Sequence, residues 1–308
     1  QFKELFFDFE YENIPLTFSI LLEELYFIIN AKSKERSLYY IKRLYKSITS
    51  EPKTKLHNDI NLNRWKEYNH ILTDSLWLMD RDNSGMHSAG YHGNFIPQIP
   101  RQMIARFTKP GDLVLDVFQG SGTTLIECIE SGRNYLGLDI NPDSITRCDQ
   151  IIKESDPEKT KNLTLSNICA DSRYFDYFDY LDKNRGMGLK TFNLIMLHPP
   201  YHNIIKFTDK KEDLSNMELH EFIDTFQGLV NRVGERLCSS GFIVLVCSDI
   251  YIDGEVYPLA FKLSECIKNI KNTSEDGDFK LKGIIAKNFG DTKGKRDKED
   301  LWRYRALV

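Results

Sequence analysis

The sequence lacks the cysteine pairs that would mark a zinc site or a disulfide framework. Its six cysteines form no Cys-x-x-Cys pair, and most stand inside apolar stretches such as 242–247. We expect buried free thiols, which fits a reducing compartment and argues against structural zinc. We predict no other metal site. The six cysteines are Cys128, Cys148, Cys169, Cys238, Cys247 and Cys266.

Long uncharged hydrophobic runs are also missing. The most apolar stretch near the start of the chain, residues 14–30, is interrupted by Pro15, Glu23 and Glu24. It is too short and too charged to span a bilayer. No signal-peptide cleavage pattern follows it. We therefore expect a cytoplasmic protein that does not bind a membrane.

An excess of positive charge is missing as well, since the 308 residues carry a formal net charge of −4. A nucleic-acid partner would need a local basic face. Residues 31–66 offer one, with ten lysines and arginines against three acidic residues, and with Tyr39, Tyr40, Tyr45 and Trp65 among them. Such runs are usually solvated surface, so a DNA contact here is only a secondary expectation.

The chain does contain a change of pattern near residue 111. Before it, residues 14–30 and 35–49 carry apolar side chains at helical spacing, and Pro52 ends the second segment. After it, short β-branched runs alternate with helical segments, which predicts an α/β fold with a doubly wound parallel sheet. We expect a helical region at 1–67 and an α/β domain at 68–308. The predicted strands are 113–117, 135–138, 163–168, 192–197, 242–247 and 279–286.

A glycine-rich loop follows the first predicted strand. Glycines let the backbone approach a ligand closely, and the hydroxyl residues after them can cap the free amides of the next helix. The Gly-Lys-Ser/Thr ending of a phosphate loop is absent, as is the full Gly-x-Gly-x-x-Gly spacing. A helix-capping turn without a ligand is the alternative. The candidate binding residues of this loop are Asp116, Phe118, Gly120, Ser121, Gly122 and Thr123.

Acidic residues follow three successive predicted strands. Asp116 and Asp139 end the first and second strands, and Asp171 follows the third. Ligands of such sheets bind at the carboxyl ends of the strands. An acid at the end of the first strand would repel a pyrophosphate, and one at the second can accept both hydroxyls of a ribose. The three acids therefore predict a cationic nucleoside as the ligand.

The fourth predicted strand, 192–197, leads directly into His198-Pro199-Pro200-Tyr201. With the glycine loop upstream, this order resembles the S-adenosylmethionine-dependent DNA amino methyltransferases, whose motif is Asp, Asn or Ser followed by Pro-Pro-Tyr. The resemblance covers residues 68–286 and implies a Rossmann-like class I methyltransferase sheet, with residues 1–67 as a small helical appendage. A bare Pro-Pro turn that ends a strand is the alternative.

The resemblance also implies how the cofactor is held. In this family the loop from Asp116 to Gly122 wraps the amino-acid part of S-adenosylmethionine, Asp139 holds the ribose, and Asp171 lies near the adenine amino group. Residues 88–100 resemble the element that closes over the methionine end of the cofactor, with Asn94 and Phe95 as candidate contacts. A purely structural role for this segment, rich in glycine and proline, is the alternative.

The residue types of the motif suit methyl transfer to an exocyclic amino nitrogen, whose lone pair is delocalised into the base. The resemblance implies that the His198 side chain and the Pro199 carbonyl accept the two amino hydrogens, while Pro200 stiffens the turn and Tyr201 stacks on a base flipped out of the duplex. His198 departs from the family pattern, and only a neutral imidazole can accept a hydrogen bond. We therefore expect methylation to fade below about pH 6.5, a typical histidine pKa.

The resemblance implies a site-specific DNA methyltransferase of a restriction-modification or defence system. Its partners would be double-stranded DNA and cognate restriction or defence subunits. Adenine N6 is slightly favoured over cytosine N4 as the target. Two alternatives stay open: an RNA or protein-glutamine amino methyltransferase, and a catalytically inactive DNA-binding regulatory subunit.

Two further expectations concern segments around and beyond the sheet. The polar segment after Tyr201 carries Lys206, Lys210 and Lys211, which are candidate phosphate contacts, although surface lysines usually have no specific role. The family normally ends its sheet with a β-hairpin. Either residues 301–308 form the last strand, or the chain is truncated.

Overall fold

The structure, a computed structural model, describes residues 18–49, 57–60, 68–82, 84–87, 95–252, 254–270 and 278–288. The chain divides into two compact units, residues 1–55 with 59–71 and residues 56–58 with 72–308. No helix in these described ranges is long and apolar enough to cross a membrane.

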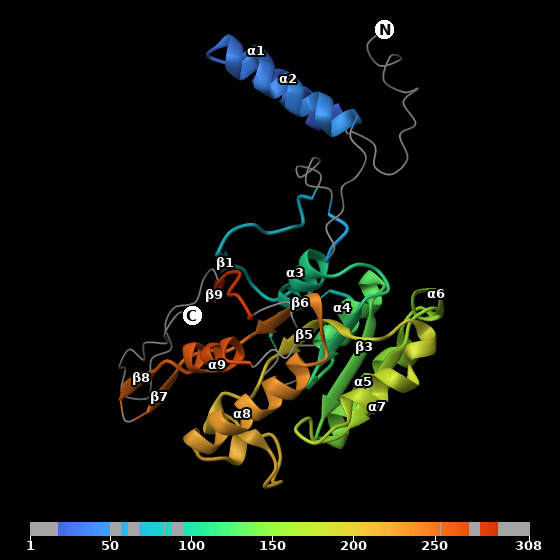
Figure 1. Ribbon diagram of the computed structural model, residues 1–308, viewed down its shortest axis with the longest axis vertical. Helices are drawn as coiled ribbons and strands as arrows, with labels where there is room; N and C mark the ends of the chain where they lie inside the picture. The colour runs from blue at the N-terminus through green and yellow to red at the C-terminus, as the bar shows by residue number, and fades with distance from the viewer. Residues whose placement is uncertain are drawn as a thin grey trace. The chain divides into compact units, whose positions relative to one another are not determined.

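The first unit contains a helical hairpin of α1 (Phe18–Ile29) and α2 (Lys34–Thr49), where two helices were predicted (Figure 1). Glu24 is buried and forms an ion pair of 2.6 Å with Arg43, which joins the middle of the two helices. The Ser37 hydroxyl donates to the carbonyl of Ile28 at 3.1 Å. Polar contacts therefore help to hold the hairpin together.

The second unit is built on five parallel strands in the order β4-β3-β2-β5-β6 (Figure 1). The chain fills one half of this sheet from β2 outward and then returns to β5 on the other side of β2. Order reversals of this kind create a crevice at the carboxyl ends of the strands. The predicted doubly wound α/β fold is confirmed. The strands are β2 (Leu113–Asp116), β3 (Asn134–Asp139), β4 (Leu165–Cys169), β5 (Phe192–Leu197) and β6 (Leu237–Leu245).

Helices cover both faces of this sheet, each over its own apolar core. The central strands β2 and β5 are almost entirely buried, as expected where helices pack on both sides. One core contains side chains of α3 (Gln98–Phe107), α4 (Thr123–Ser131) and α5 (Pro142–Glu154). The other contains side chains of α7 (Tyr177–Lys183), α8 (Leu219–Gly234) and α9 (Leu259–Lys268). A short helix, α6 (Pro157–Thr160), follows α5.

Two small strand pairs lie outside the main sheet. β7 (Ile250–Ile252) and β8 (Glu255–Tyr257) form an antiparallel pair, and β1 (Leu76–Leu78) pairs in parallel with β9 (Ala286–Asn288).

The predicted strand at 279–286 is wrong, because residues 278–285 form no strand and β9 begins only at residue 286. Leu281 and Ile284 are exposed, and only Phe279 and Ile285 of this segment pack against the apolar cores, so its side chains do not follow the burial pattern of a strand. The predicted last strand at 301–308 lies outside the described residues.

Candidate active site

A cavity of about 1040 Å³, counted with its open mouth, lies at the carboxyl ends of the central strands. Its walls come from the ends of β2, β3 and β5, from the residues after β4, and from the segment 204–214. The sequence-predicted residues that line it are Phe95, Phe118, Gly120, Thr123, Asp139, Asp171, His198, Pro199, Pro200 and Tyr201. The fold thus brings the predicted cofactor loop and the predicted catalytic motif into one space.

Three predicted loop residues lie behind the cavity wall. Asp116 is buried and accepts a hydrogen bond from the amide of Phe118 at 3.1 Å, and burial raises the pKa of its carboxyl group to about 6. Ser121 and Gly122 are buried at the start of α4. These residues lie beneath the surface of the loop, and the cavity is lined instead by residues 117–120 and Thr123. The predicted contact Asn94 lies outside the described residues.

Asp139 lies at the end of β3 and lines the cavity. Its Oδ2 accepts from the amide of Gly120 at 2.9 Å, and its Oδ1 accepts from the amide of Asn141 at 2.8 Å. Burial raises the pKa of its carboxyl group. A carboxylate oxygen has two acceptor positions, so each oxygen of Asp139 can still accept a ligand hydroxyl while it holds the glycine loop.

Asp171 lines the cavity beyond the end of β4 and forms an ion pair with Arg173. Its Oδ1 lies 2.9 Å from Nε of Arg173, and its Oδ2 lies 2.5 Å from a terminal guanidinium nitrogen. The sequence prediction named Asp171 but not this partner. The cavity therefore meets a carboxylate that is paired with a cation at Asp171, whereas backbone amides hold the carboxylate of Asp139.

His198 follows β5, and its ring lies between two aromatic side chains. The ring centroid of Phe95 is 4.8 Å away and that of Tyr201 is 5.6 Å away, and both pairs are edge-on. Nε2 of His198 lies 3.0 Å from the Tyr201 hydroxyl. Burial lowers the pKa of His198 to about 4, so the imidazole is neutral at physiological pH. The sequence led us to expect that methylation fades below about pH 6.5 as His198 gains a proton. The lower pKa corrects this expectation, because the ring gains a proton only near pH 4.

The segment 204–214 forms a further wall of the cavity, and sequence reasoning had singled out only the lysines in it. Asp213 is buried and organises it, because its carboxylate accepts from the amide and hydroxyl of Thr208 and from the amide and hydroxyl of Ser215, at 2.7–2.9 Å. The Asp-x-Ser spacing is a turn signal that could have marked this residue. Lys210, a candidate phosphate contact, donates to the carbonyl of Ile140 on the cavity wall.

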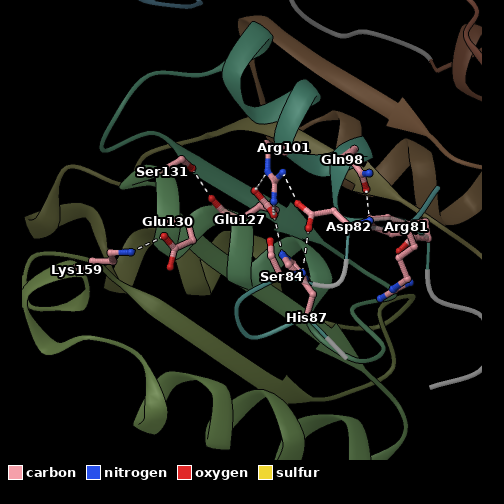
Figure 2. A network of polar contacts seen from close by, with 11 residues as sticks. Arg81, Asp82, Ser84, His87, Gln98, Arg101, Glu127, Glu130, Ser131 and Lys159 are labelled. Carbon is pink, nitrogen blue, oxygen red and sulfur yellow. Dashed lines mark hydrogen bonds and ion pairs between the residues drawn. The ribbon is translucent and has the colours of Figure 1, made fainter. Parts of the chain in front are cut away.

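A polar network joins the segment before α3 to the helix that follows the glycine loop. Figure 2 shows Arg101 of α3 between Glu127 of α4 and Asp82. Arg101 donates twice to Glu127, at 3.0 Å each, and once to Asp82 at 2.9 Å. Nε2 of His87 lies 2.8 Å from the carboxylate of the same buried Glu127. The contacts of Arg101 and His87 with Glu127 therefore connect Asp82 and His87 to α4, the helix that follows the glycine loop. Sequence reasoning gave His87 no role, and the network depends on residues far apart in the chain.

The same stretch also reaches the cavity through Arg81. Its guanidinium group donates to the carbonyl of Phe95 at 3.1 Å. Phe95 lines the cavity and packs against His198. The network of Figure 2 therefore lies beside a contact that fixes one wall of the site.

The charges of the cavity lining suit a cationic ligand. Four acidic residues line it, and no lysine or arginine does among the described residues. Such a lining disfavours phosphate groups and favours a positively charged group, although Asp171 is already paired. In the same part of the chain, no group of three or more His, Cys, Asp or Glu residues is placed to hold a metal ion. The acids are Asp139, Asp171, Glu212 and Asp213.

Comparisons with known proteins find relatives among the DNA methylases. Residues 20–153 match the family model described as a DNA methylase. The Type II methyltransferase M.MjaII of Methanocaldococcus jannaschii is 38% identical over 162 residues, which cover 51% of this chain and 29% of the relative. M.XycI of Xanthomonas campestris pv. cyanopsidis is 44% identical over 72 residues, 23% of each chain. The DNA adenine methyltransferase YhdJ of Escherichia coli is 34% identical over 89 residues, 28% of this chain and 30% of the relative.

These matches confirm the resemblance to DNA amino methyltransferases that the motifs predict. The chain matches less than a third of the length of each of these relatives. The family match ends at residue 153, ahead of His198-Pro199-Pro200-Tyr201. It includes the glycine loop and Asp139.

Proposed function

We propose that this chain, which is related in sequence to DNA methylases, transfers a methyl group from S-adenosylmethionine to an exocyclic amino group of a DNA base. The observation that carries this proposal is the single cavity in which the glycine loop, Asp139 and His198-Pro199-Pro200-Tyr201 meet. A cofactor site alone would suit any methyltransferase. Its union with an acceptor side chain, a Pro-Pro turn and an aromatic ring is what favours an amino group on a planar base.

The residues present fit S-adenosylmethionine. Asp139 has acceptor positions left for the ribose hydroxyls, and Asp171 lies on the same wall for the adenine amino group. The glycine loop lines the wall beside them and brings backbone rather than side chains to the ligand. When bound, the cofactor supplies a methyl group on a positively charged sulfonium, which the acidic lining of the cavity attracts.

The motif residues prepare the base. His198 is neutral at physiological pH and accepts one amino hydrogen, and the carbonyl of Pro199 accepts the other. Two acceptors draw the nitrogen lone pair out of conjugation with the ring and toward the methyl group. Tyr201 offers the face of its ring to a flipped base. The nitrogen forms a bond to the methyl carbon as the bond from that carbon to sulfur breaks, and it then loses one of its hydrogens as a proton to solvent. Holding both reactants in this way supplies the proximity and orientation that dominate such a transfer.

The base and the biological setting are finer parts of the proposal. We take adenine N6 as the first target to test and cytosine N4 as the second, because one matched relative is named a DNA adenine methyltransferase. The Type II names of other relatives support a role in restriction-modification. The substrate is double-stranded DNA, and cognate restriction or defence subunits are the partners to look for.

The experiment incubates the protein with duplex DNA and isotopically labelled S-adenosylmethionine, digests the DNA to nucleosides and identifies the labelled nucleoside by mass spectrometry. We expect N6-methyladenosine or N4-methylcytidine in the deoxy form. Label in RNA or in protein glutamine, offered in parallel, would replace DNA as the substrate. Binding of cofactor and DNA without any label would identify an inactive DNA-binding subunit and overturn the proposal.

A further inference from the structure

The two ring nitrogens of His198 have different surroundings. Nε2 lies 3.0 Å from the Tyr201 hydroxyl. Nδ1 has no hydrogen-bond partner among the described residues, and it is not one of the polar atoms sealed from solvent. Because His198 lines the cavity, Nδ1 is the ring nitrogen available to a substrate. The ring therefore has one protein-facing and one open nitrogen.

A neutral imidazole carries one N–H and one bare nitrogen, and the hydrogen bond at one nitrogen decides the state of the other. If the Tyr201 hydroxyl donated to Nε2, Nδ1 would carry the hydrogen and would repel an amino N–H. If Nε2–H donates to the tyrosine oxygen, Nδ1 is bare and can accept. Only the second arrangement supports the transfer proposed above.

We propose that the Tyr201 hydroxyl accepts a hydrogen bond from Nε2–H of His198 and thereby keeps Nδ1 as the acceptor for the amino hydrogen of the base. This inference rests on the proposed function. It gives Tyr201 two roles, because its ring stacks on the base and its hydroxyl positions the neighbouring side chain. Tyr201 is in this second role a positioning residue that acts through His198.

The covalent structure of histidine supports this assignment. Nδ1 is bonded to Cγ, as Oδ1 is in aspartate and asparagine, so the open nitrogen of His198 stands the same number of bonds from the backbone as the acceptor in the usual motif. A histidine ring is longer than those side chains, and its far nitrogen needs a partner when buried. The Tyr201 hydroxyl supplies that partner. Burial raises the pKa of this hydroxyl, so it stays neutral over the working pH range.

Packing holds the ring in the orientation that this hydrogen bond selects. Phe95 and Tyr201 meet the His198 ring with interplanar angles of 78° and 76°. A half-turn of the ring would point a carbon at the cavity instead of Nδ1. The hydroxyl removes that alternative because only one ring orientation places Nε2 beside it.

The first test uses Tyr201→Phe, which keeps the stacking ring and removes the hydroxyl. We expect kcat to fall on the order of ten- to a hundredfold through loss of orientation, with little change in cofactor affinity. The comparison is His198→Asn, whose acceptor does not depend on a tautomer. Adding Tyr201→Phe to His198→Asn should change kcat by less than about twofold. The hydroxyl is proposed to act through the His198 ring, so its removal has little effect once that ring is absent, and this non-additivity is what an interacting pair shows.

The second test does not depend on turnover. Nitrogen-15 NMR of the histidine-labelled full chain reports which ring nitrogen of His198 carries the hydrogen, with His198→Asn used to assign its signals. We expect Nε2–H in the wild-type protein and a mixture of tautomers in Tyr201→Phe. A wild-type ring protonated at Nδ1 would overturn the proposal, as would a Tyr201→Phe protein that methylates DNA at the wild-type rate. Failure of the wild-type protein to methylate any DNA would instead overturn the proposed function.

Discussion

The carboxylate of Asp139 accepts a hydrogen bond from the backbone amide of Gly120 at 2.9 Å, which joins the end of β3 to the glycine loop after β2. Its other oxygen accepts from Asn141. Two backbone amides therefore point at one side chain that also faces the cavity. This arrangement makes Asp139 both the support of the loop and a wall of the site.

We predict that Asp139→Asn weakens cofactor binding by about tenfold or more. An asparagine has one acceptor oxygen, so one of the two amides would face an NH2 group, and a buried unpaired donor costs about 1–3 kcal/mol. Isothermal titration with S-adenosylmethionine measures the change. Asp143→Asn is the matched control, because Asp143 is exposed in the first turn of α5 and should leave the affinity unchanged. Equal affinities for the two variants would contradict the prediction.

We predict different pH dependence for turnover and for cofactor affinity. The pKa of His198 is lowered to about 4, so kcat at saturating cofactor should stay level from about pH 8 to pH 5.5 as far as this residue is concerned. The pKa of Asp139 is raised by burial, so its acceptor capacity is lost as the pH falls through that raised value. The KM for cofactor should therefore rise in acid while kcat holds. A kcat that halves near pH 6.5 would contradict this assignment.

The same shift at His198 has a consequence for folding. Its pKa is lower in the folded chain than the usual 6.5, so between these values the unfolded chain binds the proton and the folded chain does not. The free energy of unfolding should fall as the pH drops from 6.5 toward 4. His198→Asn should show a smaller decrease over this window in urea unfolding, and an equal decrease in both proteins would assign the effect to other groups.

Local patterns in the sequence were enough to predict the sheet, the glycine loop and the motif at residues 198–201. Alternating apolar runs and turn residues are properties of neighbouring positions, and parallel strands then bring their carboxyl ends together without further information. Asp139 and His198 were placed at one edge of the sheet for this reason. The hydrogen bond from the Gly120 amide to Asp139 and the contact between His198 Nε2 and the Tyr201 hydroxyl could be found only in the structure.

Features that depend on distant contacts were not predictable. Segment 279–286 alternates like a strand, yet an alternating pattern does not say which strand is its neighbour, and only residues 286–288 pair, with β1. The bonds from Arg101 to Glu127 and from His87 to Glu127 join positions 26 and 40 residues apart. The sequence-based expectation of an ordinary histidine pKa for His198 was also wrong. Burial lowers this pKa, and burial is a property of the packed chain.

We predict that Gly122→Ala lowers the free energy of unfolding by more than the cost of placing an alanine in a left-handed backbone conformation. Gly122 has a φ of +81°, and a Cβ placed there would lie 2.9 Å from Sγ of Cys148 and 3.0 Å from Cδ1 of Ile151. Gly111 has a φ of +84° with open space around it, so Gly111→Ala isolates the backbone cost of about 1–2 kcal/mol. Gly122→Ala should lower the free energy of unfolding further and weaken cofactor binding. Equal losses of unfolding free energy in the two variants would show that the side chains of Cys148 and Ile151 move aside at no measurable cost.

We predict that the network in Figure 2 contributes to stability through one buried carboxylate. Arg101→Met removes both guanidinium bonds to Glu127, whose side chain is only 4% exposed, and leaves a buried charge beside His87. Such a loss costs about 2–4 kcal/mol in the free energy of unfolding.

Lys159→Met is the control for this change, because Lys159 pairs with Glu130 and both side chains are nearly half exposed. That variant should lose less than about 1 kcal/mol. Urea unfolding measures both variants. Combining Arg101→Met with Glu127→Gln should recover part of the lost stability, because the glutamine removes the buried charge that Arg101 no longer pairs. A double variant less stable than Arg101→Met alone would contradict this, and it would show that the Glu127 carboxylate still contributes to stability through His87 when Arg101 is gone.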